Sequence, residues 1–280
     1  MKYIYLILVL GFLGPATLTG LSTCSGPNED ADVSDSIPAQ ILPLRVMAYN
    51  IHHANPPSRP DSIDIAAIVR TIRAQDPDLI ALQEIDADTE RSGPGNQARI
   101  IADSLGMQVF FGKSIDFGGG EYGVAVLSKF PISEETVHRL PTIPETKGEK
   151  RVLATVKVTL AQDRHIRFAS THLDSQKEDT NRLLQIKEIG RIASKESLPL
   201  IIAGDFNASP GSEVIDILDQ NFKRTCDDCE PTIPVDHPEK AIDFIVFHPK
   251  KAFKVLKHKV VDETYASDHL PIVADLEVQR

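Results

Sequence analysis

Leu200-Ile-Ile-Ala-Gly-Asp205-Phe-Asn207 is an apolar run that ends in Asp-Phe-Asn. An apolar run with a turn residue at its end is typical of a buried β-strand. A charged or polar group placed directly after such a strand is costly to bury unless it is paired or binds a metal ion. We therefore expect this strand, predicted over 198–204, to deliver Asp205 and Asn207 to a functional site.

The same arrangement recurs along the chain. The other polar residues at the ends or starts of apolar segments are Asn50, Glu84, His172 with Asp174 close behind, Asp243, Asp268 and His269. Taken singly, each has an ordinary role such as a helix cap, an Asx turn or a hydrogen-bonded core histidine. Their conjunction is what indicates a site, because functional residues of α/β sheets gather where strands end on one edge.

This set of side chains favours a particular chemistry. Carboxylate and amide oxygens suit Mg²⁺, and also Mn²⁺ or Ca²⁺, better than zinc. Together with histidine, such a set is fitted to phosphoryl chemistry, in which charge neutralisation and positioning supply most of the catalysis. Arg151 and Arg91 are additional candidates for contact with a phosphate.

The rest of the chain predicts one mixed α and β domain over 44–280. Strands are expected at 44–50, 78–84, 107–111, 122–128, 151–160, 166–172, 198–204, 242–247 and 271–278. Helical spacing is found at 64–75, 96–105 and 178–195. No repeat and no interior linker divides this segment.

Composition and charge indicate a soluble globular protein and disfavour two modes of nucleic-acid binding. The 280 residues are 41% hydrophobic and 25% charged, as in soluble globular proteins. The net charge of −10 disfavours a sequence-independent grip on nucleic acid, which depends on lysine and arginine. With no tryptophan and 6% aromatic residues, a stacking platform for single strands is also disfavoured. Neither argument excludes an enzyme that meets phosphate through a metal ion.

The amino terminus has the pattern of an export signal. Met1-Lys2 is followed by an apolar run that ends at Gly14-Pro15, which predicts a signal peptide over 1–23. Leu21-Ser22-Thr23-Cys24 resembles a bacterial lipobox, although Thr23 is atypical, so Cys24 is a candidate lipid anchor. Residues 24–43 have the composition of a flexible tether. We expect a monomer exported across the inner membrane, either periplasmic or anchored as a lipoprotein.

Cys226 and Cys229 are spaced C-x-x-C. A redox motif would be expected at a helix start after a strand, and a zinc site would need four ligands, where only His237 lies near. In an exported protein the pair predicts a short-loop disulfide.

The motifs also resemble those of a known family. In order, Asn50, Leu82-Gln-Glu84, Ser170-Thr-His172-Leu, Gly204-Asp-Phe-Asn207, Ile242-Asp243-Phe and Ser267-Asp-His269 are similar to the motifs of the endonuclease/exonuclease/phosphatase superfamily. This group of metal-dependent phosphoesterases includes nucleases, neutral sphingomyelinases and inositol-polyphosphate 5-phosphatases. The resemblance implies a four-layer α/β sandwich in which two mixed β-sheets lie face to face with helices outside.

The resemblance also implies residue roles. Glu84 would bind the divalent metal, with Asp268 contributing. Asp205 would orient or deprotonate the attacking water, while Asn207 and Asn50 would hold the water and the phosphate. His269, oriented by Asp243, would stabilise the charge of the transition state, and His172 would contact the phosphate or act as an acid for the leaving oxygen.

The expected function is Mg²⁺-dependent hydrolysis of phosphate esters outside the cytoplasm, by attack of a metal-assisted water. The alternatives are a nuclease, a sphingomyelinase-like phospholipase, and a tethered protein that binds a ligand without turnover. A soluble phosphomonoester or phosphodiester is the least demanding substrate, and nucleic acid is not excluded.

Overall fold

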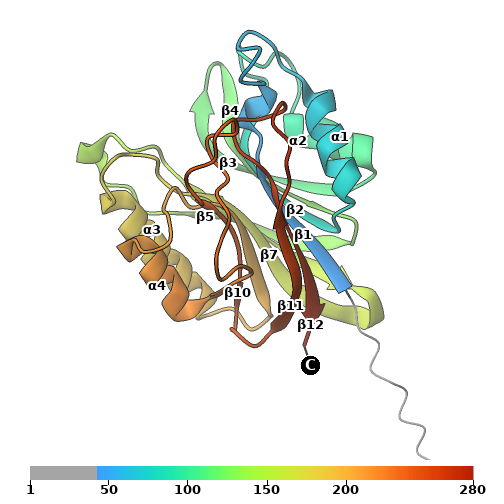
Figure 1. Ribbon diagram of the computed structural model, residues 1–280, viewed down its shortest axis with the longest axis vertical. Coiled ribbons are helices and arrows are strands. Elements are labelled where there is room, and N and C mark those ends of the chain that lie inside the picture. Colours follow the sequence, from blue (N-terminus) through green and yellow to red (C-terminus); the bar gives the residue numbers. More distant parts are fainter. Residues whose placement is uncertain (1–42, 280) are drawn as a thin grey trace, which may run out of the picture. The chain divides into compact units, whose positions relative to one another are not determined.

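Two six-stranded β-sheets form the centre of the computed structural model, which describes residues 43–279 (Figure 1). The predicted signal peptide, Cys24 and the tether up to residue 42 lie outside the described residues. The strand order of the first sheet is β11 (Phe253–Val260), β12 (Ile272–Val278), β1 (Pro43–Asn50), β2 (Leu79–Ala87), β4 (Gly120–Ser128) and β3 (Gln108–Phe117). That of the second is β5 (Ile132–Arg139), β6 (Val152–Leu160), β7 (Arg164–His172), β8 (Leu200–Asp205), β10 (Asp243–His248) and β9 (Lys223–Arg224).

Helices cover the outer face of each sheet. The helices α1 (Ile65–Gln75) and α2 (Gln97–Leu105) lie against the first sheet, and α3 (Thr180–Ala193) and α4 (Glu213–Asn221) lie against the second (Figure 1). Short 3-10 helices span His52–Ala54, Pro144–Thr146 and Ala161–Asp163. The predicted four-layer α/β sandwich is confirmed.

The continuous apolar strands are explained by burial on both faces. In β1, Val46 and Ala48 point into the core between the sheets, whereas Met47 and Tyr49 pack under the helices α1 and α2. Strands covered on both sides read as unbroken apolar runs, because both sets of alternating side chains leave water.

Each sheet is built around one parallel pair of strands. In the first sheet β1 runs parallel to β2, with Asn50 level with Gln83. In the second β7 runs parallel to β8, with His172 level with Asp205. Parallel neighbours end on the same edge, so the polar residues that follow these strands are brought together in each sheet.

Glycine permits close packing at two positions, one between the sheets and one within the second sheet. A Cβ atom added to Gly112 of β3 would lie 2.5 Å from the Cβ atom of Ala154 in β6. Within the second sheet, a Cβ atom at Gly204 would lie 2.0 Å from the carbonyl oxygen of Thr171. Both positions therefore depend on the absence of a side chain.

Some elements differ from the sequence predictions. The strands β5 and β11 and the helix α4 were not predicted. Both strands lie at sheet edges and expose many of their side chains, so neither contains a long apolar run. The strand β2 continues beyond Glu84 to Ala87, and β3 continues to Phe117, because the β2–β4 and β3–β4 ladders extend through irregularities.

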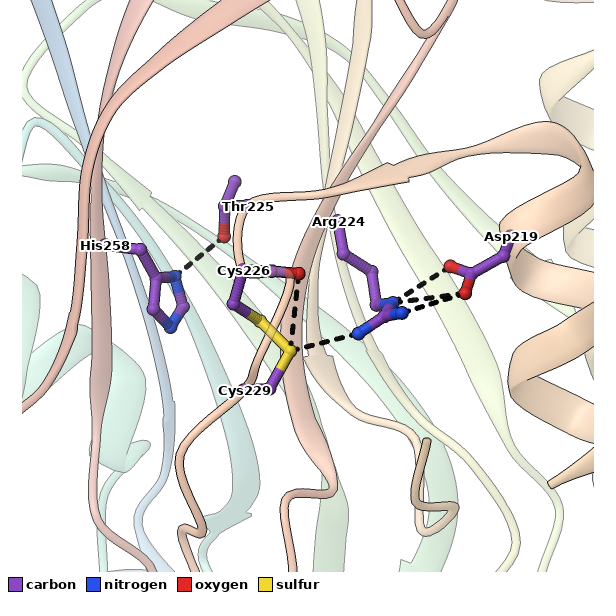
Figure 2. The surroundings of a disulfide bond; sticks show 6 residues. All are labelled: Asp219, Arg224, Thr225, Cys226, Cys229 and His258. Carbon is purple, nitrogen blue, oxygen red and sulfur yellow. Dashed lines mark hydrogen bonds and ion pairs between the residues drawn. A yellow bond between two sulfur atoms is a disulfide. The ribbon is translucent and has the colours of Figure 1, made fainter. Parts of the chain in front are cut away.

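Cys226 and Cys229 form the predicted disulfide, with an S–S distance of 2.05 Å (Figure 2). Arg224 lies beside it, donating from Nη1 to Cys229 Sγ at 3.1 Å and from Nε to Asp219 Oδ1 at 2.9 Å. Among residues 43–279, none of the helices has the length and apolar character needed to cross a membrane.

Candidate active site

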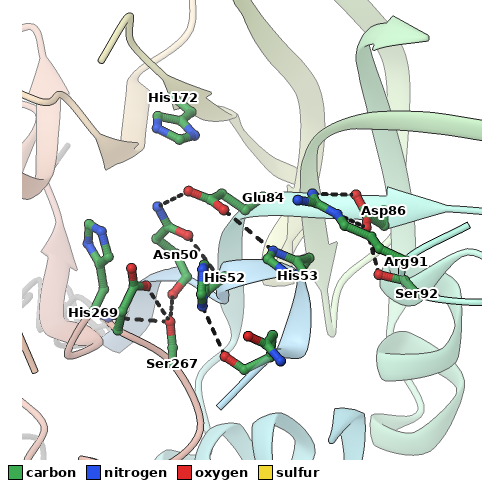
Figure 3. Close-up of polar contacts among 12 residues, drawn as sticks. Asn50, His52, His53, Glu84, Asp86, Arg91, Ser92, His172, Ser267 and His269 are labelled. Atoms are coloured by element: carbon green, nitrogen blue, oxygen red, sulfur yellow. Dashed lines mark hydrogen bonds and ion pairs between the residues drawn. The ribbon is translucent and has the colours of Figure 1, made fainter. Parts of the chain in front are cut away.

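The predicted polar residues meet where strand ends of the two sheets come together. Asn50, at the end of β1, links the sheets: its Nδ2 donates to Glu84 Oε1 at 3.2 Å (Figure 3) and to Asp205 Oδ2 at 3.1 Å. Asn50 is separated from Asp205 by 155 residues in the sequence. One amide therefore holds together a carboxylate from each sheet.

Glu84 is aimed into the site by a local irregularity of β2. The ladder with β4 shifts between Leu82 and Ile85, and Glu84 has a left-handed φ of 58°. Such a bulge turns a side chain out of the regular alternation of the strand. Burial opposes ionisation of Glu84, but the nearby imidazole of His53 and the hydrogen bond from Asn50 outweigh it, so the pKa of Glu84 lies well below its usual value.

Asp205 occupies the centre of the site and is 1% exposed. Its Oδ1 accepts from the backbone N–H of Asn207 at 2.8 Å, and its Oδ2 lies 3.4 Å from His172 Nε2. Burial and the nearby charge of Asp243 raise the pKa of Asp205 to about 7. This carboxylate is therefore poised to exchange a proton near neutral pH.

His269 and Asp243 form a buried pair. His269 Nδ1 lies 2.9 Å from Asp243 Oδ2, and His269 Nε2 lies 3.8 Å from Asp205 Oδ2. Burial works against the charged imidazole, but the charge and hydrogen bond of Asp243 outweigh it and raise the pKa of His269 to about 10. His269 is therefore positively charged at neutral pH.

His172 has the opposite character. Burial, reinforced by the charge of Arg151, holds the pKa of His172 well below its usual value. Its Nδ1 is buried without a hydrogen-bond partner among the described residues. A neutral imidazole next to Asp205 is suited to hydrogen bonding with a phosphate oxygen, and less suited to donating a proton as an acid.

Asn207 and Asp268 flank this centre. Asn207 has a left-handed φ of 48°, and its Nδ2 donates to the carbonyl of Leu173 at 3.1 Å, which leaves its side-chain oxygen for a ligand. Asp268 adds negative potential beside His269 and lies next to Ser267, whose hydroxyl donates to the carbonyl of Asn50 at 2.7 Å. That bond ties the last loop of the site to β1.

The two predicted arginines are placed differently. Arg151 is 4% exposed, and its charge reaches both His172 and Tyr122. Arg91 binds Asp86 through Nε at 2.7 Å and Nη2 at 2.9 Å (Figure 3), and its guanidinium lies 4.5 Å from the centre of the Phe117 ring. Arg151 therefore lies at the site, whereas two donors of Arg91 are committed to a carboxylate; contact of either residue with phosphate stays a prediction.

The donor set fits a divalent cation. Glu84 is ionised, its Oε1 accepts one hydrogen bond from Asn50, and its Oε2 lies 3.8 Å from His53 Nδ1. Within residues 43–279, two groups bring three ligand atoms within 4.8 Å of one another, and they are His52, His53 and Glu84, and Asp205, Asp243 and His269. The carboxylate oxygens among these donors are the kind of ligand that Mg²⁺, Mn²⁺ and Ca²⁺ prefer, whereas the imidazoles of His52 and His53 are ligands of transition metals.

Three residues of the site were not predicted. His52 and His53 reach Glu84 because they and Ala54 all have left-handed φ angles, a local conformation that the sequence does not reveal. Thr232 donates to Asp243 Oδ2 at 2.5 Å from a loop 11 residues away. The adjacent His-His after Asn50 was the only signal available for the first two, and none existed for Thr232.

The fold and this site define a class of protein, the sandwich-fold phosphoesterases. Residues 47–269 match the Endonuclease/Exonuclease/phosphatase family. The chain belongs to that family, whose members are hydrolases acting on phosphoester bonds and are generally dependent on divalent metals.

Known proteins are similar to different extents. Protein cwh43 of Schizosaccharomyces pombe is 29% identical over 147 residues, which are 52% of this chain but only 14% of that relative. An endonuclease/exonuclease/phosphatase from Beutenbergia cavernae is 26% identical with a TM-score of 0.72, covering 84% of this chain and 72% of that one. The mannosyl-6-phosphatase Bt3783 of Bacteroides thetaiotaomicron is 20% identical with a TM-score of 0.67, covering 83% and 99%, and supports the fold.

Proposed function

We propose that this protein is a Mg²⁺-dependent phosphoesterase that hydrolyses small phosphate esters outside the cytoplasm. The observation that carries the proposal is the position of Asp205, which lies between a neutral His172 and a charged His269 and is joined by Asn50 to Glu84. A water activator, a fixed positive charge and an ionised metal ligand thus meet where the strand ends of the two sheets come together.

The residues divide the reaction among themselves. Glu84 and Asp268 would hold the cation, which when bound neutralises charge on the phosphate. Asp205, with a pKa of about 7, orients the attacking water and accepts its proton, while the free oxygen of Asn207 helps to hold that water. His269, kept charged by Asp243, stabilises the negative charge that develops on the phosphoryl oxygens.

The remaining polar groups act on the phosphate. The neutral His172 donates a hydrogen bond to a phosphate oxygen, and the Asn50 amide fixes the relative positions of the metal ligand and the water activator. Arg151 supplies further positive potential.

Surface properties favour a soluble, small substrate over nucleic acid or a lipid surface. The chain carries a net charge of −10. Among the described residues the exposed large apolar side chains are Ile100, Phe117, Leu184 and Leu256, which come from four separate elements rather than from one aromatic hairpin. A structurally similar protein is named as a mannosyl-6-phosphatase, which agrees with a small phosphomonoester.

The proposed compartment rests on the amino terminus and the disulfide. The signal-peptide pattern over 1–23 and the lipobox-like Cys24 predict export, and a disulfide persists in an oxidising compartment. Incorporation of labelled palmitate that is lost in Cys24→Ala would support a lipoprotein. No incorporation in the parent would rule out the lipid anchor and favour a periplasmic protein without one.

The catalytic assignment is tested by Mg²⁺-dependent hydrolysis of bis(p-nitrophenyl) phosphate and p-nitrophenyl phosphate. Asp205→Ala and His269→Ala should each reduce kcat by at least about a hundredfold. Asp103→Ala, which removes an exposed carboxylate from α2, is the matched control and should leave the rate unchanged. If all variants behave alike, the assignment is wrong.

Metal binding is measured separately from turnover. Isothermal titration with Mg²⁺ or Mn²⁺ should show a site that is lost in Glu84→Gln and kept in Asp103→Ala. Binding of phosphate esters without any turnover would instead support the alternative of a tethered ligand-binding protein.

A further inference from the structure

A second hollow lies beside the proposed active site. It has a volume of about 910 Å³, which falls in the range of sites for small organic ligands. It lies between the end of β3 in the first sheet and the loop that joins β5 to β6 in the second. Its charged lining residues are Lys113, Asp116, Arg139, Glu149, Lys150 and Arg151.

Arg151 lines this hollow and also lies close enough to His172 to affect its pKa. It directly precedes β6, and in the ladder of β6 with β7 Leu153 is level with Thr171, whose hydroxyl donates to the carbonyl of Val152 at 2.9 Å. The residue after Thr171 is His172, whose pKa is lowered by burial and by the charge of Arg151. A substrate whose phosphate is bound at His172 therefore has this hollow directly next to it.

The lining is positively charged in a chain that is negatively charged overall. It contains four cationic side chains against two carboxylates, whereas the whole chain has a net charge of −10. Lys113 is held by Asp116 at 2.6 Å, and Arg139 donates to the carbonyl of Ser114 at 2.5 Å. Lys150 is exposed and makes no ion pair with any residue of the described part of the chain, so its charge is available to a ligand.

Arg151 has hydrogen-bonding capacity that the protein does not use. It is 4% exposed, yet its Nε has no hydrogen-bond partner within residues 43–279. Its Nη1 lies 2.8 Å from Glu149 Oε1, but that oxygen also lacks an aligned hydrogen bond. A buried guanidinium with an unmet donor is costly, and an anion in the adjoining hollow would satisfy it.

Building on the proposed function, we propose that this hollow binds a second anionic group of the substrate. The substrate would then be a small phosphate ester that carries a second phosphate or a sulfate group. One phosphate is hydrolysed at Asp205, and the other is held by Arg151 and Lys150. The cations are gathered in one hollow rather than spread along a groove, which fits a compact ligand better than a nucleic acid strand.

Binding can be read without turnover in the Asp205→Asn background with Mg²⁺ present. The probes are fructose 1,6-bisphosphate and fructose 6-phosphate, followed by isothermal titration. We expect the bisphosphate to bind about tenfold more tightly, as one charge-assisted contact would provide. Lys150→Glu should remove this preference and leave the affinity for the monophosphate unchanged. Lys147→Glu, an exposed position of the same loop that does not line the hollow, should keep it.

Several outcomes would overturn the inference. Equal binding of the two probes, or a preference that survives Lys150→Glu, would show that the hollow takes no second anion. A short oligothymidylate that binds more tightly than the bisphosphate and depends on Lys150 would replace the small ester with a nucleic acid. If the bisphosphate preference is present but the parent protein hydrolyses neither ester, the proposed function fails while the binding site stands.

Discussion

Thr232 donates a hydrogen bond of 2.5 Å to Asp243 Oδ2, the same oxygen that lies 2.9 Å from His269 Nδ1. Thr232 is fully buried, and its backbone carbonyl accepts from the N–H of Leu270 at 2.8 Å. One residue thus braces both the carboxylate that orients His269 and the backbone that follows His269. Thr232 acts through Asp243 and is a positioning residue.

Replacing Thr232 by valine keeps the shape of the side chain and removes the hydroxyl. We expect kcat for p-nitrophenyl phosphate to fall about tenfold with little change in KM, because Asp243 loses the contact that fixes its orientation. Thr232→Ser retains the hydroxyl and should retain most of the activity. Equal losses in the serine and valine variants would show that loss of the hydrogen bond does not by itself explain the effect.

Asp205→Asn should stabilise the metal-free protein at alkaline pH. The pKa of Asp205 is raised from about 3.9 in an unfolded chain to about 7 in the fold, so its ionisation costs stability. The cost is absent below about pH 4, grows between pH 4 and 7, and is complete above pH 7.

The measurement is denaturant unfolding in EDTA at pH 4 and pH 8. The asparagine variant should gain roughly 1–3 kcal/mol over the parent at pH 8, with less or no gain at pH 4. Added Mg²⁺ should narrow the difference, because the cation favours the ionised parent. A stability gain that is independent of pH would mean that burial does not raise the pKa of Asp205.

Gly112→Ala should force the two sheets apart locally. The added Cβ atom would lie 2.5 Å from that of Ala154, a contact that requires the backbone to move. We expect a loss of about 1–3 kcal/mol in the free energy of unfolding. Ala154→Gly removes the opposing methyl group, so the double variant should recover much of that loss; purely additive losses would contradict the proposed contact.

Removal of the disulfide should have a small effect. Cys226 and Cys229 are only three residues apart, so the loop that the bond closes is short. Chain-entropy arguments give such a loop at most about 2 kcal/mol. The double variant Cys226→Ser/Cys229→Ser should have a free energy of unfolding lower than that of the parent by up to that amount, and reductant should not change it. The free energy of unfolding of the parent should fall on reduction. A parent that does not respond to reductant would count against the bond.

Much of the site was predictable because its residues follow apolar strands. Asn50, Glu84, His172, Asp205, Asp243 and His269 were all expected at strand ends, and the structure brings them together. Burial leaves a local record in the sequence, since unbroken apolar runs show which strands are covered on both faces. The edge strands β5 and β11 left no such record because their side chains are largely exposed.

The amino-acid order alone was sufficient for the mixed α and β class, the central strands and the oxygen-rich set of candidate ligands, because each follows from local pattern and residue type. The four-layer sandwich was implied by the resemblance of the motifs to a known family. Three features were visible only in the tertiary structure. Asp86 binds Arg91, and Thr232 donates a hydrogen bond to Asp243. Arg151 is buried between His172 and a second hollow. The tertiary structure also set the opposite pKa shifts of His172 and His269. These features depend on burial and on contacts between distant segments, which no local window of sequence contains.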